Sequence, residues 1–242
     1  MKTLKEVFGT EKPIIGMLHL AGFGAHEKME IAKKEIESLY RSGVTAVLAE
    51  NYFGGSRDVE NVLAFLQEAY PHKIYGVNIL GDPELAFALA RKYGAKFVQI
   101  DSVCGHVQPR YDAALARELA RLRGPGDIFL LGGVRFKYTL HLSGRSLEED
   151  LKLGTERCDA IVVTGAGTGI CTDLEKIKSF RRILGAFPLI VGAGMTAENA
   201  PEQLIYADGA IVGSYFKEQG LTEYPVDETR VRKLMAAVSG IC

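Results

Sequence analysis

Residues 188–214 have the sequence PLIVGAGMTAENAPEQLIYADGAIVGS, which contains one full copy of a unit that recurs along the chain. The apolar run Pro188–Val191 is followed by a glycine-rich turn, an amphipathic segment over Ala197–Tyr206 and a second apolar run over Gly209–Gly213. Runs that are apolar almost throughout are typical of strands buried on both faces of a parallel sheet. The stretch therefore predicts a strand, a helix and a second, parallel strand.

The same alternation continues toward the N-terminus, and one more helix follows the last run. Eight strands are expected: Ile14–Leu20, Val44–Asn51, Lys73–Leu80, Phe97–Asp101, Ile128–Arg135, Ala160–Thr164, Pro188–Val191 and Gly209–Gly213. Eight helices are expected: Glu27–Ser42, Arg57–Tyr70, Pro83–Tyr93, Arg110–Arg123, Ser146–Arg157, Thr172–Leu184, Ala197–Tyr206 and Val226–Ser239. Capping signals support these boundaries, as at Asp82-Pro83 and Tyr93-Gly94.

The number of units points to one architecture. Eight strand–helix units in 242 residues leave about 30 residues for each, the size of a βαβ repeat. Roughly 250 residues is typical of a (β/α)8 TIM barrel, although a doubly wound open sheet uses the same alternation. The count of eight and the lack of a proline- or serine-rich linker favour a single barrel domain over residues 1–242.

Composition narrows the class of protein. Lys and Arg number 29 against 30 Asp and Glu, for a net charge of −1, which argues against a nucleic-acid partner. No stretch approaches the roughly 20 apolar residues of a membrane span, and the N-terminus lacks the apolar core of a signal peptide. The cysteines, at 104, 158, 171 and 242, form no CxxC pair and are expected to be reduced. We therefore expect a cytoplasmic protein.

Function in such a barrel lies in the loops that follow the strands, and the last two loops are glycine-rich. Gly192 and Gly194 follow the seventh run, and Gly213 with Ser214 follows the eighth. Glycines let the backbone approach an anion closely, and these two loops are the recurrent phosphate site of the fold. Tight turns are the alternative, but the paired glycines beside Ser and Thr hydroxyls favour a phosphate cradle.

The loop after the sixth run reads TGAGTG over residues 164–169. Its GxGxG spacing differs from the GxGxxG of a dinucleotide site, and no acidic residue ends a strand about 20 residues later. We expect this loop, with Thr164, Gly165 and Thr168, to let a substrate lie over the barrel mouth, or to be mobile.

Polar residues at the other strand ends are the catalytic candidates: His19, Asn78, Glu50, Asp101 and Lys137. A carboxylate buried at a barrel mouth can have its pKa raised enough to act as a general base. Glu50 or Asp101 could then remove a proton next to a carbonyl, while Lys137 stabilises the enediolate or forms a Schiff base.

Structural roles compete with these assignments. Glu50 could instead form an ion pair with Lys137 or Arg135, and Asn78 could satisfy loop backbone groups. Cys104 and His106 lie close to Asp101 in sequence and could hold zinc or form a nucleophilic pair, but we assign them no metal and no catalytic role. The sequence requires no cofactor and leaves a divalent metal open.

Several strings resemble the BtpA/SgcQ family. They include PIIGMLHL at residues 13–20, Glu50-Asn51, GVNIL at 76–80, DAIVVTG at 159–165, VGAGMTAEN at 191–199 and IVGS at 211–214. The resemblance runs from about residue 13 to 238 and implies a barrel of the ribulose-phosphate-binding type. One member type is associated with photosystem I accumulation, and another lies among sugar-uptake genes. This chain departs from the family at residues 101–106 and at Tyr138, where a Lys-His pair is usual.

We therefore expect a protein that binds a small phosphorylated metabolite, a phosphosugar or phosphoribosyl compound, and isomerises or epimerises it. An aldolase or glycosyl-phosphate reaction at the same site is the nearest alternative. A non-catalytic assembly or regulatory protein that uses the barrel as a platform is the alternative from another class. A homo-oligomer is compatible with a barrel of this size.

Overall fold

The computed structural model describes residues 2–241, and its eight strands form one closed parallel barrel in sequence order. The strands are β1 (Ile14–Leu18), β2 (Ala46–Glu50), β3 (Ile74–Asn78), β4 (Phe97–Cys104), β5 (Phe129–Val134), β6 (Ala160–Val163), β7 (Leu189–Val191) and β8 (Gly209–Val212). Closure comes from pairing of β8 with β1, in which Ile14 lies opposite Ala210. The predicted (β/α)8 TIM barrel is confirmed.

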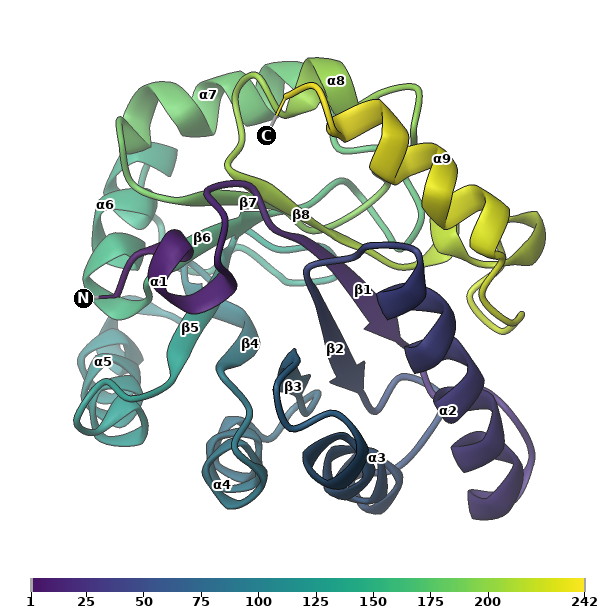
Figure 1. Ribbon diagram of the computed structural model, residues 1–242. Coiled ribbons are helices and arrows are strands. Elements are labelled where there is room, and N and C mark those ends of the chain that lie inside the picture. Colours follow the sequence, from purple (N-terminus) through teal and green to yellow (C-terminus); the bar gives the residue numbers. More distant parts are fainter. Residues whose placement is uncertain (1, 242) are drawn as a thin grey trace.

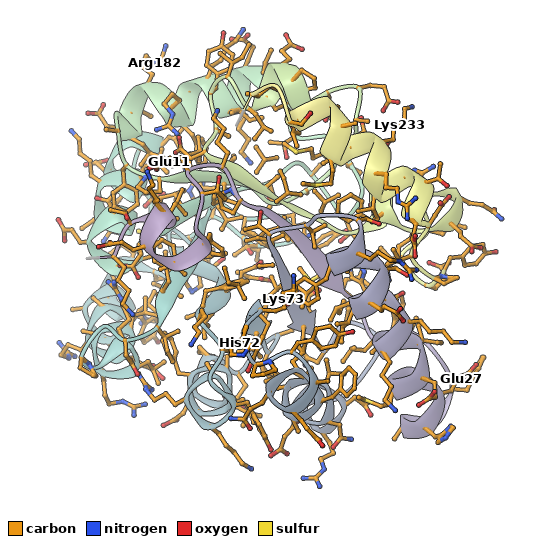
Figure 2. All side chains as sticks on the ribbon, viewed as in Figure 1. Glu11, Glu27, His72, Lys73, Arg182 and Lys233 are labelled. Carbon is orange, nitrogen blue, oxygen red and sulfur yellow. The ribbon has the colours of Figure 1, made fainter. Side chains whose placement is uncertain are left out.

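Helices surround the strands in Figure 1. They are α2 (Gly24–Arg41), α3 (Ser56–Ala69), α4 (Pro83–Tyr93), α5 (Pro109–Arg123), α6 (Leu147–Arg157), α7 (Leu174–Leu184), α8 (Ala200–Gln203) and α9 (Glu228–Val238), with α1 (Leu4–Phe8) before the barrel and short 3₁₀ turns η1 (Ser214–Phe216) and η2 (Glu218–Gly220) after β8. Charged side chains cover their outer faces, as Glu27 on α2, Arg182 on α7 and Lys233 on α9 show in Figure 2. The apolar faces pack on the strands, as amphipathic helices require.

Several elements begin or end a few residues from the expected boundaries, and two of these differences have a clear structural cause. Strand β4 extends to Cys104, beyond the predicted Asp101, because a register shift against β5 between Ile100 and Cys104 allows pairing to resume. Helix α8 is shorter than the predicted Ala197–Tyr206. Its start is delayed because Thr196 and Asn199 hydrogen-bond to each other's backbone N–H groups and the Asn199 amide also donates to the Gly194 carbonyl, which holds the loop before the helix.

Helix α1 is an element that the eightfold repeat does not predict. A capping box between Thr3 and Glu6 begins it, and Gly9 ends it in a left-handed conformation with φ of 72°. Its Phe8 ring lies 5.1 Å from the ring of Phe97 and 5.9 Å from that of Phe129, centroid to centroid. Because both partners belong to the first residues of barrel strands, α1 covers the N-terminal end of the barrel.

The core has two parts, one inside the barrel and one between the strands and the helices. The inner part includes Met17, Leu48, Leu131, Val162 and Ile211, one from each of five strands. Successive residues of a strand alternate between its two faces. The residues two positions further along, toward the C-terminal end, therefore face the interior as well, and this places the strand-end side chains at the barrel mouth.

Truncation of Phe8 tests the role of α1. We expect Phe8→Ala to lower the free energy of unfolding by about 3 to 5 kcal/mol, since it removes a ring buried against two others. Urea denaturation measures this, and Lys5→Ala, at an exposed position of the same helix, should change it by less than about 0.5 kcal/mol. Equal effects of the two substitutions would show that α1 does not close the barrel.

Candidate active site

A pocket of about 100 Å³ lies at the C-terminal ends of the strands. The acidic and amide side of its wall comes from β2 and β4, with Glu50, Gln99 and Asp101. The opposite side comes from the loops after β6, β7 and β8, with Gly169, Gly192, Gly194, Gly213 and Ser214. The pocket is thus lined by both groups of residues that the sequence singled out.

The two carboxylates are joined by an amide. Asn78 Nδ2 donates to Glu50 Oε1 over 2.9 Å and to Asp101 Oδ1 over 3.1 Å, and Gln99 Nε2 donates to the same Asp101 oxygen over 3.0 Å. The register of β2 and β3, which places Glu50 opposite Asn78, produces the first contact. Asn78 therefore positions carboxylates, and the alternative in which it served only loop backbone groups does not describe these bonds.

Glu50 has the environment of a proton-transfer group. Its side chain is 6% exposed. Its pKa is raised to about 7, chiefly by burial and then by the negative charge of Asp101, while Lys137 and the Asn78 hydrogen bond oppose the shift. A carboxyl group with such a pKa is present in both protonation states near neutral pH, which is the condition for general acid–base chemistry.

Lys137 forms no ion pair with Glu50 among residues 2–241. Its Nζ donates to Thr168 Oγ1 over 3.1 Å, and its backbone N–H donates to Thr164 Oγ1 over 2.8 Å. Arg135 pairs with Asp150 instead, over 3.2 Å. The predicted alternative of a structural ion pair at Glu50 is therefore wrong. The Lys137 ammonium group lines the pocket and its charge acts on Glu50 from a distance.

His19 is a neutral imidazole at the edge of the pocket. It is 3% exposed, and burial, followed by the charges of Lys217 and Lys137, lowers its pKa well below the usual range. Its Nδ1 has no hydrogen-bond partner among the described residues. A Cβ atom at Gly213 would lie 2.7 Å from the ring, so only glycine at this position leaves room for the histidine.

The glycine-rich loops pack against one another. Gly194 has φ of +66°, and a Cβ there would lie 2.2 Å from the Ile170 carbonyl oxygen. A Cβ at Gly169 would lie 3.0 Å from Ser214 Oγ. The loops after β6, β7 and β8 therefore form one continuous backbone wall, and the residues predicted to hold a phosphate are part of it.

The three residues predicted in the loop after β6 have different positions. Thr168 lines the pocket, and its backbone N–H donates to the Tyr138 hydroxyl over 2.8 Å. Thr164 is fully buried and holds the Lys137 backbone. A Cβ at Gly165 would lie 2.8 Å from the Cys171 carbonyl oxygen, so this glycine permits a close backbone approach. Only Thr168 of the three is placed to touch a ligand.

A buried ion pair anchors the loop after β8. Lys217 donates to Glu35 of α2, and the two side chains are 1% and 3% exposed. Removing one member of such a pair typically costs about 3 to 5 kcal/mol because the other charge stays buried. The pair therefore links the Ser214 loop firmly to the outer helix ring.

Nine of the pocket residues are not among the predicted site residues: Met17, Tyr52, Leu80, Gln99, Phe136, Tyr138, Gly169, Ala193 and Ile211. A signal for Gln99 does exist, since it is a polar residue within an apolar run, two positions before Asp101 and thus on the same strand face. Of the others, Met17, Leu80 and Ile211 belong to the predicted apolar strands, and Gly169 and Ala193 belong to the glycine-rich loops. Tyr52, Phe136 and Tyr138 look like ordinary loop residues in sequence. Their position depends on how the loops fold back over the mouth.

Cys104, Cys158 and Cys171 belong to no metal site within the described part of the chain. Residues 2–241 contain no group of three or more His, Cys, Asp or Glu side chains arranged to hold a metal. Cys104 is buried with Sγ 3.8 Å from Asp150 Oδ1, and burial raises the pKa of its thiol to about 11. Cys104, Cys158 and Cys171 are free thiols, and Cys242 lies outside the described residues.

Two further features concern the rest of the molecule. No helix within residues 2–241 is long and apolar enough to cross a membrane. A larger hollow, of about 650 Å³, lies near α5 and is lined by Lys2, Arg123 and Asp159. It contains none of the strand-end residues, and Arg123 is paired with Asp159 over 2.5 Å. We therefore place the chemistry in the smaller pocket.

A family model described as the BtpA family matches residues 10–240. The chain belongs to the BtpA family. It is 33% identical to an uncharacterized protein of Thermococcus kodakarensis, with 93% of this chain and 94% of that protein covered. It is 27% identical to the putative sgc region protein SgcQ of Escherichia coli (100% and 99% covered) and 26% identical to the photosystem I biogenesis protein BtpA of Synechocystis (98% and 91% covered).

Solved structures with a similar fold share little sequence with this BtpA-family chain. 3-Hexulose-6-phosphate synthase of Salmonella typhimurium has a TM-score of 0.63 and 16% identity, with 93% of this chain and 98% of that chain covered. Phosphoribosyl anthranilate isomerase of Thermus thermophilus has a TM-score of 0.60 and 15% identity, with 95% and 100% covered. At this level of identity the similarity establishes the shared barrel fold.

The pKa of Glu50 predicts a pH-dependent stability. An unfolded glutamate titrates near 4.5, whereas folding raises the pKa of Glu50 to about 7. Between these values the unfolded chain ionises and the folded one does not, so the native state loses stability as pH rises. Relative to Glu50→Gln, the wild type should lose on the order of 3 kcal/mol of unfolding free energy between about pH 4.5 and about pH 8.

Urea denaturation across that range measures the difference. Glu68→Gln on α3, an exposed position, is the matched control and should follow the wild type at every pH. A constant difference between wild type and Glu50→Gln would show that the pKa of Glu50 is not raised.

Proposed function

We propose that this protein is an isomerase or epimerase of a small phosphorylated sugar or phosphoribosyl compound. The observation that carries the proposal is that Glu50, a buried carboxyl group with a pKa raised to about 7, lies across a single pocket from a glycine-lined wall. One side of the pocket is suited to proton transfer. The other side is suited to an anion.

The glycine wall is the proposed phosphate cradle. Gly192, Gly194, Gly213 and Ser214 come from the two loops that recurrently bind phosphate in this fold. Because three of these positions are glycines and have no Cβ, the backbone can approach the phosphate oxygens closely. The phosphate would fix one end of the substrate and leave its carbonyl carbon on the side of the carboxylates.

The carboxylate side supplies the chemistry. The Glu50 carboxylate would take a proton from the carbon next to the carbonyl, and the electron pair would move to the carbonyl oxygen to form an enediolate. The Lys137 ammonium group would stabilise that oxygen, since an ion in a water-poor pocket interacts strongly with developing charge. Glu50 would return the proton to the neighbouring carbon for isomerisation. For epimerisation a second acid, for which Asp101 is the candidate, would deliver a proton to the opposite face of the same carbon.

Two uncharged groups complete the proposed site. The neutral His19 ring, whose Nδ1 is unpartnered among the described residues, would move a proton between the two enediol oxygens. Gln99 Oε1 is also buried without a partner there, because its Nε2 is turned to Asp101. A carbonyl oxygen of this kind would accept a substrate hydroxyl, and a buried acceptor without a partner is costly.

A platform function is the second candidate. Large apolar side chains are exposed at the barrel mouth, among them Phe23, Tyr138 and Leu140. One relative is named a photosystem I biogenesis protein. The polar cluster around Glu50 favours the enzymatic reading, because a docking platform has no need of a buried carboxylate pair.

Substituting the cradle serine tests phosphate binding. We expect Ser214→Asp to abolish binding of ribose 5-phosphate by like-charge repulsion, while the melting temperature without ligand changes little. A ligand at about 100 times its dissociation constant stabilises the wild type by about 2.7 kcal/mol, which thermal unfolding detects. Ser214→Ala is the size control and should retain the stabilisation. Undiminished binding by Ser214→Asp would show that the phosphate lies elsewhere.

Deuterium incorporation tests the proton transfer. Wild-type protein in D₂O should exchange the proton next to the carbonyl of ribulose 5-phosphate, xylulose 5-phosphate or fructose 6-phosphate, followed by NMR. Glu50→Gln should slow the exchange by at least about 100-fold, the usual contribution of a general base, and Glu68→Gln should leave it unchanged. Binding of these compounds without exchange would contradict the isomerase assignment and favour the platform.

A further inference from the structure

Three apolar side chains line the pocket on its solvent side and remain exposed. Tyr52 follows β2, Leu80 follows β3 and Tyr138 follows β5, and their exposed fractions are 38%, 37% and 75%. We call these three residues the apolar rim. Each belongs to a loop at the C-terminal end of the barrel, so the rim continues outward from the same pocket that holds Glu50.

Tyr138 is held in place at a conformational cost. Its φ of 61° lies in the left-handed region, which bulky residues rarely adopt. Its hydroxyl accepts the Thr168 backbone N–H over 2.8 Å, so the side chain is tied to the loop after β6. Although its backbone conformation and its hydroxyl contact both hold Tyr138 in place, its side chain remains three-quarters exposed. Strained backbone that persists is characteristic of ligand clamps.

Tyr52 is fixed on the opposite side by other aromatic rings. Its ring lies 5.2 Å from the His19 ring and 4.9 Å from the Phe53 ring, both nearly edge-on. Since His19 is buried and Phe53 is 40% exposed, this aromatic series extends from a buried pocket residue to the surface. The rim is therefore built from pre-positioned rings, which bind at a lower entropic cost than mobile side chains do.

The pocket is small for a site that binds a whole substrate. Its volume of about 100 Å³ is the space of only a few water molecules. Pockets that enclose whole small-molecule ligands measure about 300 to 1,000 Å³. A ligand with its phosphate on the glycine wall and its reacting carbon at Glu50 fills this space, and whatever else it carries lies on the apolar rim.

We propose that the substrate is a phosphorylated compound that carries a planar, largely apolar ring, and that this ring lies on the apolar rim of Tyr52, Leu80 and Tyr138. The inference rests on the proposed phosphate cradle and adds the substrate class. A planar ring fits because the Tyr138 hydroxyl is already engaged by Thr168, which leaves the face of the ring as the surface that it offers. Aromatic rings pair through such faces and edges.

Binding of matched ligands tests the proposal. Isothermal titration calorimetry would compare ribose 5-phosphate with adenosine 5′-phosphate and uridine 5′-phosphate, which add a planar ring to the same phosphorylated sugar, and with adenosine, which lacks the phosphate. We expect at least one nucleotide to bind wild-type protein about tenfold more tightly than ribose 5-phosphate does, consistent with the strength of base–aromatic stacking. Adenosine should bind more weakly than adenosine 5′-phosphate.

Variants locate the effect. Tyr138→Ala should bring the affinity ratio of nucleotide to ribose 5-phosphate close to one, because it removes the ring on which the planar group would lie. Ile205→Ala, which removes another exposed apolar side chain outside the pocket, should leave the ratio unchanged. Tyr138→Phe keeps the ring, and a preserved ratio in this variant would assign the effect to the ring itself.

The outcomes separate this inference from the proposed function. If ribose 5-phosphate binds and neither nucleotide binds more tightly, or if Tyr138→Ala leaves the ratio unchanged, the substrate class is wrong and the phosphate cradle stands. If adenosine binds as tightly as adenosine 5′-phosphate, or if none of the compounds binds, the cradle fails and the inference fails with it. Failure of all these compounds to bind would point to a protein partner on the apolar rim.

Discussion

The hydrogen bonds between β8 and β1 are the interaction on which the site depends. They place Ile14 opposite Ala210 and Gly16 opposite Val212 and so convert an open sheet into a barrel. A closed barrel has no unpaired strand edge. It also brings the ends of β7 and β8 around to face the ends of β2 and β4, which would lie far apart in an open sheet. The glycine wall and the carboxylates share a pocket because of this closure.

Closure also determines which side of the mouth carries which chemistry. At the last inward position, β2, β3 and β4 carry Glu50, Asn78 and Asp101, whereas β7 and β8 end at Gly192 and Gly213. One half of the mouth therefore holds proton-transfer and amide groups, and the other half exposes backbone. Because Lys137 bonds to Thr168 rather than to Glu50, burial dominates the environment of Glu50, and its pKa rises.

The loops around the mouth are tied to each other as well as to the strands. Lys137 and Tyr138 bond to Thr168, and Lys217 bonds to Glu35 of α2. These contacts join the loop after β5 to the loop after β6, and the loop after β8 to the helix ring. The pocket is consequently a preformed site, which reduces the cost of ordering it when a ligand binds.

The family relatives carry names as different as SgcQ and a photosystem I biogenesis protein, so the chemistry has to be decided from such sites rather than from the fold.

The sequence by itself determined the barrel fold and which polar and glycine residues lie near the strand ends. Alternating apolar and amphipathic runs, with glycines after them, are local properties, and the period of two along a strand makes Glu50, Asp101 and Gly213 face inward once the strands are known. The sequence did not determine how far β4 extends, that α1 covers the barrel floor, or that Tyr52 and Tyr138 lie at the pocket. Those features depend on contacts between residues distant in sequence, such as Phe8 with Phe97 and Tyr138 with Thr168. The raised pKa of Glu50 likewise arises from burial among neighbours on other strands, so only the tertiary structure decided it.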